Sequence, residues 1–211
     1  MEFLHAIIVL SNFVVIPAIA YGSQLALGAL GVTLVYGILR FSNFAHGDTM
    51  AFGTMVAILF TWWFQSIGVS IAPLPTALLA LPIAIVVTAA LLLGTDRVVL
   101  RFYRKQKSAP VILLIVSLGI MFVYNGLVRF IIGVGDQRFS DGARFIISAR
   151  DFKKLTGLDE GLAIKTTQVI TVITAVLVVA ILFWFLNRTR TGKSMRAFSD
   201  NEDLALLSGI N

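Results

Sequence analysis

The sequence lacks cysteine and has very few histidines. None of its 211 residues is cysteine, which excludes disulfide scaffolds, thiol nucleophiles and thiolate metal sites. The two histidines, His5 and His46, stand far apart, and neither has the spacing of a metal-ligand motif such as HExxH. We therefore expect no metal site.

Charge is also scarce. Charged residues make up 13% of the chain, about half of the fraction that is usual in a soluble domain. Hydrophobic residues make up 58%, and the mean hydropathy is +0.91. No Asp, Glu, Lys or Arg occurs in residues 3–39, 49–95, 108–128 or 166–187. Because stretches of this length can cross a bilayer, the sequence predicts an all-α integral membrane protein with several transmembrane helices.

The apolar stretches divide into five or six expected spans. As one helix, residues 49–95 would be more than twice as long as the bilayer core, so the chain must turn, and Gly68, Pro73 and Pro75 mark that turn. Pro17 and Gly22 divide the N-terminal stretch in the same way. The spans lie near residues 4–20, 22–39, 50–66, 76–94, 109–132 and 166–187, in a single transmembrane domain over residues 1–211. Without the first of them the count is five.

The basic loops predict the orientation. Arginines and lysines follow the spans that end near residues 94 and 187, two crossings apart, so both loops are cytoplasmic by the positive-inside rule. This bias accounts for the net charge of +6 without a nucleic-acid partner. Residues 133–165 mix both signs of charge and form the expected outer loop, with a short amphipathic helix around residues 149–155. Six spans would leave both termini inside, and five would put the N-terminus outside.

A polar cluster stands between two of the apolar stretches. Its members are Asn43, His46, Gly47 and Asp48. Polar groups near membrane depth are costly unless they face protein or water. They could therefore lie in a pathway through irregular backbone, or they could form an interfacial loop in which Asp48 caps the next helix.

Two other spans carry features of close helix packing. Small residues dominate residues 22–39, which lets neighbouring helices approach that span closely. In the span 109–132, Ser117 and Asn125 can hydrogen-bond across helices or line a path.

The segment 188–211 follows the last span and is expected in the cytoplasm. Ser199 and Glu202 form a capping-box pattern, and Gly209 is placed to end the helix that they begin. This helix, at residues 199–209, would carry Leu204, Ala205 and Leu207 outside the membrane. Such an apolar surface indicates a docking partner, or packing against the chain's own spans.

These segments resemble a known family, the branched-chain amino acid permeases of ATP-binding-cassette (ABC) transporters. Residues 28–48, GALGVTLVYGILRFSNFAHGD, closely resemble the signature of that family. Residues 188–197, RTRTGKSMRA, resemble its basic lead-in, and residues 202–211, EDLALLSGIN, resemble its EAA loop. Glu202, Ala205 and Gly209 fit that loop, whereas Asp203 and Leu204 depart from the two alanines of the general importer pattern. The resemblance extends from about residue 22 to residue 211.

The resemblance implies a permease subunit that carries branched-chain or related amino acids across a bacterial plasma membrane. Such a subunit is not an enzyme and holds no cofactor, because ATP is bound by a separate ABC ATPase. A second permease and a periplasmic or extracellular solute-binding protein complete the importer. The cluster of Asn43, His46, Gly47 and Asp48 would then belong to the substrate pathway. The residues expected to couple the chain to the ATPase are Arg196, Ser199, Glu202, Ala205, Leu207 and Gly209.

Other interpretations remain open from the sequence. Within the same family, the solute could be urea or a short amide. A channel or scaffold without any ATPase would have no need of an exposed capped helix after the last span. An intramembrane enzyme would need more than His46 and Asp48, which stand two residues apart without a nucleophile. Family members continue with further spans after the EAA loop, so the chain is expected to be truncated.

Overall fold

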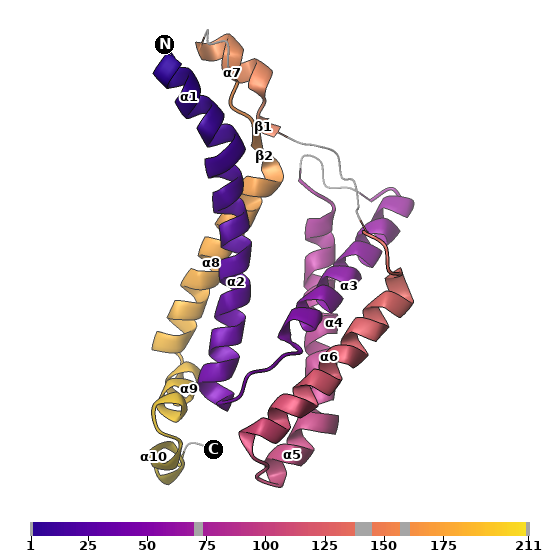
Figure 1. Cartoon of the computed structure of the whole chain (residues 1–211), viewed down its shortest axis with the longest axis vertical. Coiled ribbons are helices and arrows are strands. Elements are labelled where there is room, and N and C mark those ends of the chain that lie inside the picture. Colours follow the sequence, from indigo (N-terminus) through magenta and orange to yellow (C-terminus); the bar gives the residue numbers. More distant parts are fainter. Residues whose placement is uncertain (1, 70–73, 138–144, 157–160, 210–211) are drawn as a thin grey trace. The chain divides into compact units, whose positions relative to one another are not determined.

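The computed structural model describes residues 2–69, 74–137, 145–156 and 161–209 (Figure 1). In chain order the elements are α1 (Glu2–Leu10), a π-helical turn (Ser11–Val15), α2 (Ile16–Leu39), α3 (His46–Ser66), α4 (Ala77–Thr95), a second π-helical turn (Asp96–Leu100), α5 (Arg101–Lys105), α6 (Pro110–Ile132), β1 (Phe145–Ile147), α7 (Ala149–Thr156), β2 (Ile164–Lys165), α8 (Thr166–Arg188), α9 (Arg190–Asp200) and α10 (Glu202–Leu207). The predicted helical fold class is confirmed, with β1 and β2 as a short exception.

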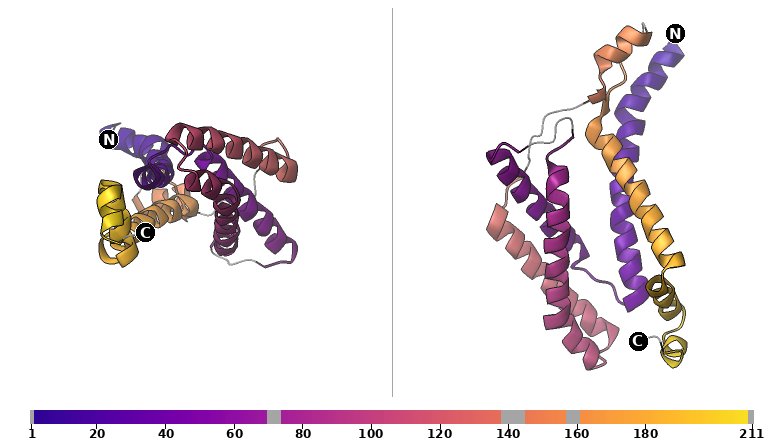
Figure 2. Two further views of the ribbon diagram at one scale, coloured as in Figure 1. Left: turned by 90° about the horizontal axis from the view of Figure 1, so that it is seen from below. Right: turned by 180° about the vertical axis from the view of Figure 1, so that it is seen from behind.

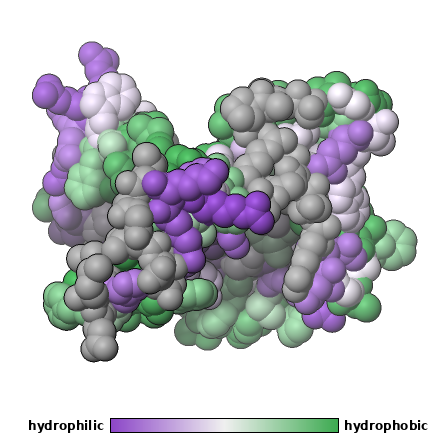
Figure 3. Space-filling model, turned by 90° about the horizontal axis from the view of Figure 1, so that it is seen from above, coloured by the Kyte–Doolittle hydropathy of each residue, from purple (hydrophilic) through white to green (hydrophobic). Residues whose placement is uncertain are grey.

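Four helical runs of the described chain are long and apolar enough to cross a membrane. They are His5–Ile38, Ala77–Lys105, Pro110–Ile132 and Thr166–Arg188. Only 6–22% of the apolar window in each run is buried within the chain. Exposed hydrophobic side chains, green in Figure 3, accordingly occur widely over the face seen there. A helix that is apolar on all sides and uncovered by its own chain suits lipid or neighbouring membrane helices.

The N-terminal stretch differs from its expected division. Instead of breaking at Pro17 or Gly22, the helix continues through both residues from α1 into α2. A π-helical turn, Ser11–Val15, ends two residues before Pro17. Such turns change the hydrogen-bond register inside a helix, and a register change offers a way to accommodate the N–H that proline lacks. The number of crossings in this stretch stays a prediction.

The turn predicted after the third expected span is confirmed. Gly68 has φ +74°, and its N–H donates to the Gln65 carbonyl at 3.1 Å. The next N–H, of Val69, donates to the Phe64 carbonyl at 2.9 Å. These two bonds form a Schellman motif, in which a residue in the left-handed conformation ends the helix. Helix α3 itself begins at His46, earlier than the expected boundary near residue 50.

The chain divides into two compact units, Gly31–Asp141 and Met1–Leu30 with Gly142–Asn211. In the first, α3 packs against α4 and α6 around a core of Phe52, Met55, Val56 and Ala84. Gly53 lets α3 approach α4, since a Cβ atom there would lie 3.1 Å from Thr88 Oγ1. The assignment of all 211 residues to one transmembrane domain stays a prediction.

The second unit contains the part of the expected outer loop that follows residue 141, together with the C-terminal segment. Strand β1 pairs antiparallel with β2, and the predicted amphipathic helix between them is confirmed as α7. The Asn12 side chain accepts a hydrogen bond from the Ala163 N–H at 3.2 Å, which ties the loop to the N-terminal helix. Figure 2 shows α9 and α10 continuing from the end of α8.

Candidate functional site

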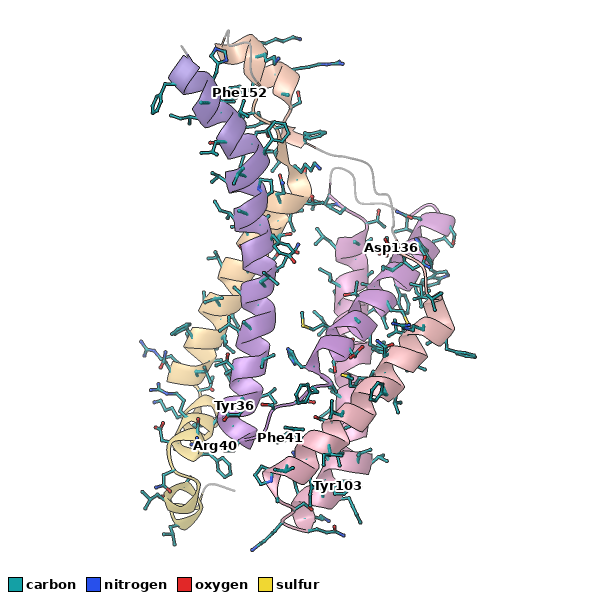
Figure 4. All side chains as sticks on the ribbon, viewed as in Figure 1. Tyr36, Arg40, Phe41, Tyr103, Asp136 and Phe152 are labelled. Carbon is teal, nitrogen blue, oxygen red and sulfur yellow. The ribbon has the colours of Figure 1, made fainter. Side chains whose placement is uncertain are left out.

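The polar cluster begins where α2 ends. Arg40 takes the left-handed conformation, with φ +56°, and its N–H donates to the Tyr36 carbonyl at 2.9 Å. Figure 4 shows Tyr36 and Arg40 at this end of α2, with Phe41 on the connection that follows. Phe41 and Ala45 are 3% and 2% exposed, and Ala45 packs against Ile120 and Tyr124 of α6. The connection is therefore anchored at both ends by buried apolar residues.

Ser117 of α6 holds the backbone of this connection. Its side chain is fully buried, and its Oγ accepts a hydrogen bond from the Phe44 N–H at 3.2 Å. The same hydroxyl donates to the Leu114 carbonyl at 2.7 Å. A hydrogen bond of this kind contributes about 0.5–1.5 kcal/mol, so this hydroxyl stabilises an irregular backbone segment. The sequence suggested that Ser117 could hydrogen-bond across helices or line a path, and the bond to the Phe44 N–H is of the first kind.

Asn43 and His46 shape the entry into α3. The Asn43 Oδ1 accepts a hydrogen bond from the Ala45 N–H at 3.1 Å, a turn typical of asparagine. His46 is the first residue of α3, and its imidazole lies against Gly31 of α2. A Cβ atom at Gly31 would lie 2.6 Å from both Cε1 and Nε2 of this ring. At least one small residue of α2 thus makes room for a side chain of the cluster.

Asp48 connects α3 to α6. It lies in the first turn of α3, and its Oδ1 accepts a hydrogen bond from Asn125 Nδ2 at 2.9 Å. The interfacial-loop interpretation assumed that Asp48 caps this helix. The N-cap residue is instead Ala45, and no side chain makes a capping hydrogen bond there. Both residues are partly buried, and no basic residue of the described chain forms an ion pair with the carboxylate. The cluster thus offers a partly buried carboxylate that is held by a neutral amide.

The members of the cluster face different neighbours. The His46 imidazole contacts α2, whereas the Asp48 carboxylate bonds to α6. Asn43 is occupied with its own turn, and Gly47 is exposed. This division gives no support to an acid–base pair of His46 and Asp48. Their expected place in a substrate pathway stays a prediction, and Asn125 now joins the same group.

The C-terminal segment departs from its predicted cap. Ser199 lies inside α9, so it does not begin the next helix. The chain instead becomes extended at Asn201, with φ −153°, and the Asn201 Oδ1 accepts the Leu204 N–H at 3.1 Å. Asparagine is as good a helix cap as serine, so the later residue replaces the predicted one. The expected helix at residues 199–209 becomes α10, Glu202–Leu207.

The other residues of the expected coupling helix divide into two groups. Gly209 has φ +78°, the left-handed conformation predicted for the residue that ends α10. Leu204 and Leu207 are 60% and 84% exposed, whereas Ala205 is 4% exposed and α10 packs against α9. Ala205 therefore serves the packing of the segment, and the apolar surface it was expected to share consists of the two leucines. The side chain of Glu202 lies outside the described residues.

The turn from α8 to α9 fixes the direction of this segment. The Thr189 Oγ1 accepts a hydrogen bond from the Gly192 N–H at 3.0 Å and donates to the Phe185 carbonyl at 2.7 Å. A Cβ atom at Gly192 would collide with the Phe185 carbonyl oxygen and would lie 2.7 Å from Leu186 Cα. Arg196, one of the expected coupling residues, donates to Asn187 Oδ1 at 2.6 Å. Close backbone contact and these three hydrogen bonds thus hold α9 against the end of α8.

Comparisons with known proteins place these segments in a family. A family model described as the permease component of the branched-chain amino acid transport system matches residues 14–211. The high-affinity branched-chain amino acid transport system permease protein BraD of Pseudomonas aeruginosa is 28% identical over 197 residues, which are 93% of this chain and 61% of BraD. LivH of Salmonella typhimurium, of the same description, is 28% identical over 196 residues, 92% of this chain and 60% of LivH.

A probable branched-chain amino acid transport permease protein, LivH of Methanocaldococcus jannaschii, is also 28% identical, over 200 residues. The alignment covers 92% of this chain and 56% of that protein, so the chain spans less than two thirds of the length of these relatives. No solved structure gives a significant match. Because the family model includes both the polar cluster and the C-terminal segment, the chain belongs to the branched-chain amino acid transport system permease family.

Proposed function

We propose that this chain is a permease subunit of an ATP-driven importer, and that it carries branched-chain or related amino acids across a bacterial plasma membrane. The match of the family model to residues 14–211 carries the proposal. In this role the chain has no catalytic site of its own. A separate ABC ATPase hydrolyses ATP in the cytoplasm, a second permease completes the pathway, and a solute-binding protein delivers the amino acid.

The α9–α10 segment is the proposed contact with the ATPase. Leu204 and Leu207 project exposed apolar side chains from α10. Such side chains can insert into a groove on a partner protein and lose their contact with water there. The close backbone contact at Gly192 restricts rotation of α9 against α8. This restriction supports a role of α9 in transmitting movement to α8. Movement of the ATPase would then reach the membrane helices as a rigid-body displacement.

Affinity purification tests this contact. The full-length gene product is tagged, extracted from membranes in mild detergent and analysed by mass spectrometry. We expect a P-loop ATPase to accompany the wild type and to be lost from the L204E/L207E variant. Val134, which is 83% exposed and lies in the expected outer loop, provides the matched control V134E. Retention of the ATPase by L204E/L207E, or its equal loss from V134E, would contradict the proposed contact.

The polar cluster is the proposed part of the substrate pathway. Its partly buried carboxylate can accept hydrogen bonds from a polar or cationic group of a solute, and Asn125 holds it in place. We expect Asp48→Asn to lower uptake of radiolabelled leucine by at least tenfold, the equivalent of about 1.4 kcal/mol, while the ATPase still co-purifies. Normal uptake by this variant would assign the cluster a structural role only.

A further inference from the structure

An open basic groove lies where α4 passes through the second π-helical turn into α5. It has a volume of about 360 Å³ and is lined by Leu93, Asp96, Arg97, Arg101 and Arg104. Leu93 and the three arginines follow one another at intervals of three or four residues, which places them on one face of a helix. Figure 4 labels Tyr103, which lies in α5 together with Arg101 and Arg104. The polar cluster and the α9–α10 segment contribute no residue to this groove.

The groove carries a surplus of two positive charges. Asp96 forms an ion pair with Arg104 at 2.5 Å. Arg97 and Arg101 are exposed, and neither forms an ion pair with a described residue. Their guanidinium groups are therefore available to an anion. Phosphate suits such a site because guanidinium can donate two parallel hydrogen bonds to its oxygens.

The groove also lies at the expected depth of lipid headgroups. The run Ala77–Lys105 has 29 residues, so it is about 43 Å long and exceeds the hydrocarbon core of about 30 Å. Its basic end therefore emerges from the core, on the cytoplasmic side by the positive-inside rule. Leu93, on the apolar side of the groove, is 71% exposed, so acyl chains can pack beside the charged residues. A basic groove next to apolar surface matches an anionic phospholipid better than a soluble anion.

We propose that this groove binds the phosphate of an anionic phospholipid of the cytoplasmic leaflet through Arg97 and Arg101. The acyl chains extend along the apolar surface at Leu93 towards the membrane centre. Asp96 limits the affinity because its carboxylate neutralises Arg104 and repels the phosphate. The site thus retains a lipid on this helix, independently of the proposed transport function.

Titration of the purified full chain in a neutral detergent tests the proposal. The probes are dioctanoyl phosphatidylglycerol, dioctanoyl phosphatidylcholine and inorganic phosphate, and native mass spectrometry counts the bound molecules. The R97Q/R101Q variant removes both unpaired guanidinium charges. Its matched control is K153Q/K154Q, which removes the same charge from two exposed lysines of α7. The D96N variant is expected to raise the affinity, which a folding defect would not imitate.

We expect phosphatidylglycerol to bind the wild type and K153Q/K154Q alike, about thirtyfold more weakly to R97Q/R101Q, and severalfold more tightly to D96N. If phosphatidylglycerol bound equally weakly to both double variants, the weaker binding would follow from the lower net charge alone, which would contradict the proposed site. Equal binding of phosphatidylcholine would remove the role of the anionic headgroup. Inorganic phosphate that binds as tightly as the lipid would identify a soluble anion as the occupant and contradict the lipid assignment.

Discussion

At the scale of single residues, the contact between Gly31 and His46 gives a test with a control on the same helix. Gly31→Ala would place a methyl group 2.6 Å from the imidazole, whereas nothing lies within 4 Å of a Cβ atom at Gly22. We expect Gly31→Ala to destabilise the protein by about 1–3 kcal/mol. Gly22→Ala is expected to be neutral or to stabilise by up to about 1 kcal/mol. Thermal unfolding in detergent measures both effects. A lower unfolding midpoint for Gly22→Ala alone would contradict the close contact between Gly31 and His46.

The hydrogen bond between Asp48 and Asn125 can be measured by a double-mutant cycle. The two side chains are in contact at 2.9 Å, so the effects of Asp48→Ala and Asn125→Ala should not add. We expect a coupling of about 0.6–1.7 kcal/mol, as for other hydrogen bonds between membrane helices. The free energy of unfolding in mixed micelles provides the measurement. A second cycle combines Asp48→Ala with Gln106→Ala, in the turn between α5 and α6, and its two effects should add. Additive effects at positions 48 and 125 would argue against the bond.

Asn125 also illustrates where prediction from the sequence ends at this scale. The cost of polar groups near a membrane singled out Asp48, but its partner stands 77 residues away in the chain. Local pattern carries no information on such a pairing, because it is set by how α3 packs on α6. The same holds for Ser117, whose bond to the Phe44 N–H joins residues 73 positions apart.

At the scale of elements, the turn between α5 and α6 carries a residue that is poorly suited to its conformation. Lys107 has φ +49°, and the Ser108 N–H donates to the Tyr103 carbonyl at 3.2 Å, so a Schellman motif ends the helix at a lysine. The left-handed conformation costs a residue with a Cβ atom about 1–2 kcal/mol. We therefore expect Lys107→Gly to raise the unfolding free energy by about 1 kcal/mol.

Lys105→Gly is the matched control for this substitution. It removes the same charge two residues earlier, from the last residue of α5. Glycine in a helix costs about 1 kcal/mol relative to alanine, so this variant should be less stable. Opposite signs for the two variants in thermal unfolding would establish the strain at Lys107. A loss of stability in both would show that charge or packing at residue 107 outweighs its backbone conformation.

Helix ends were predictable from the sequence only where one residue type dominated the choice. Gly68 and Gly209 were predicted to end helices and have positive φ. Ser199 was a reasonable cap, but Asn201 competes two residues later and holds the Leu204 N–H. Pro17 was expected to break its helix, whereas the helix continues through it after a π-helical turn at Ser11–Val15. Both errors arose because an alternative local solution was available that the pattern did not reveal.

At the scale of the whole molecule, the absence of cysteine makes the membrane orientation directly testable. Any cysteine introduced into this chain is its only thiol, so labelling with a membrane-impermeant maleimide reports one position at a time. We expect Lys105→Cys and Lys193→Cys to react only after the cells are permeabilised, because the positive-inside rule places both loops in the cytoplasm. Lys154→Cys, in α7, should react in intact cells.

Helix α3 is not among the four apolar runs, so the span expected near residues 50–66 stays a prediction. With that span counted, the N-terminal helix determines whether the total is five spans or six. The run His5–Ile38 has 34 residues, so it is about 51 Å long, too long for one perpendicular crossing of about 30 Å and too short for two separate ones. Phe3 lies two residues before the first residue of this run, so Phe3→Cys reports the side of the membrane on which the N-terminal end of the helix emerges. With Lys105→Cys on the inside, labelling of Phe3→Cys in intact cells would give one crossing and five spans. Labelling only after permeabilisation would give two crossings, and the continuous helix would then have to open between Pro17 and Gly22 in the membrane.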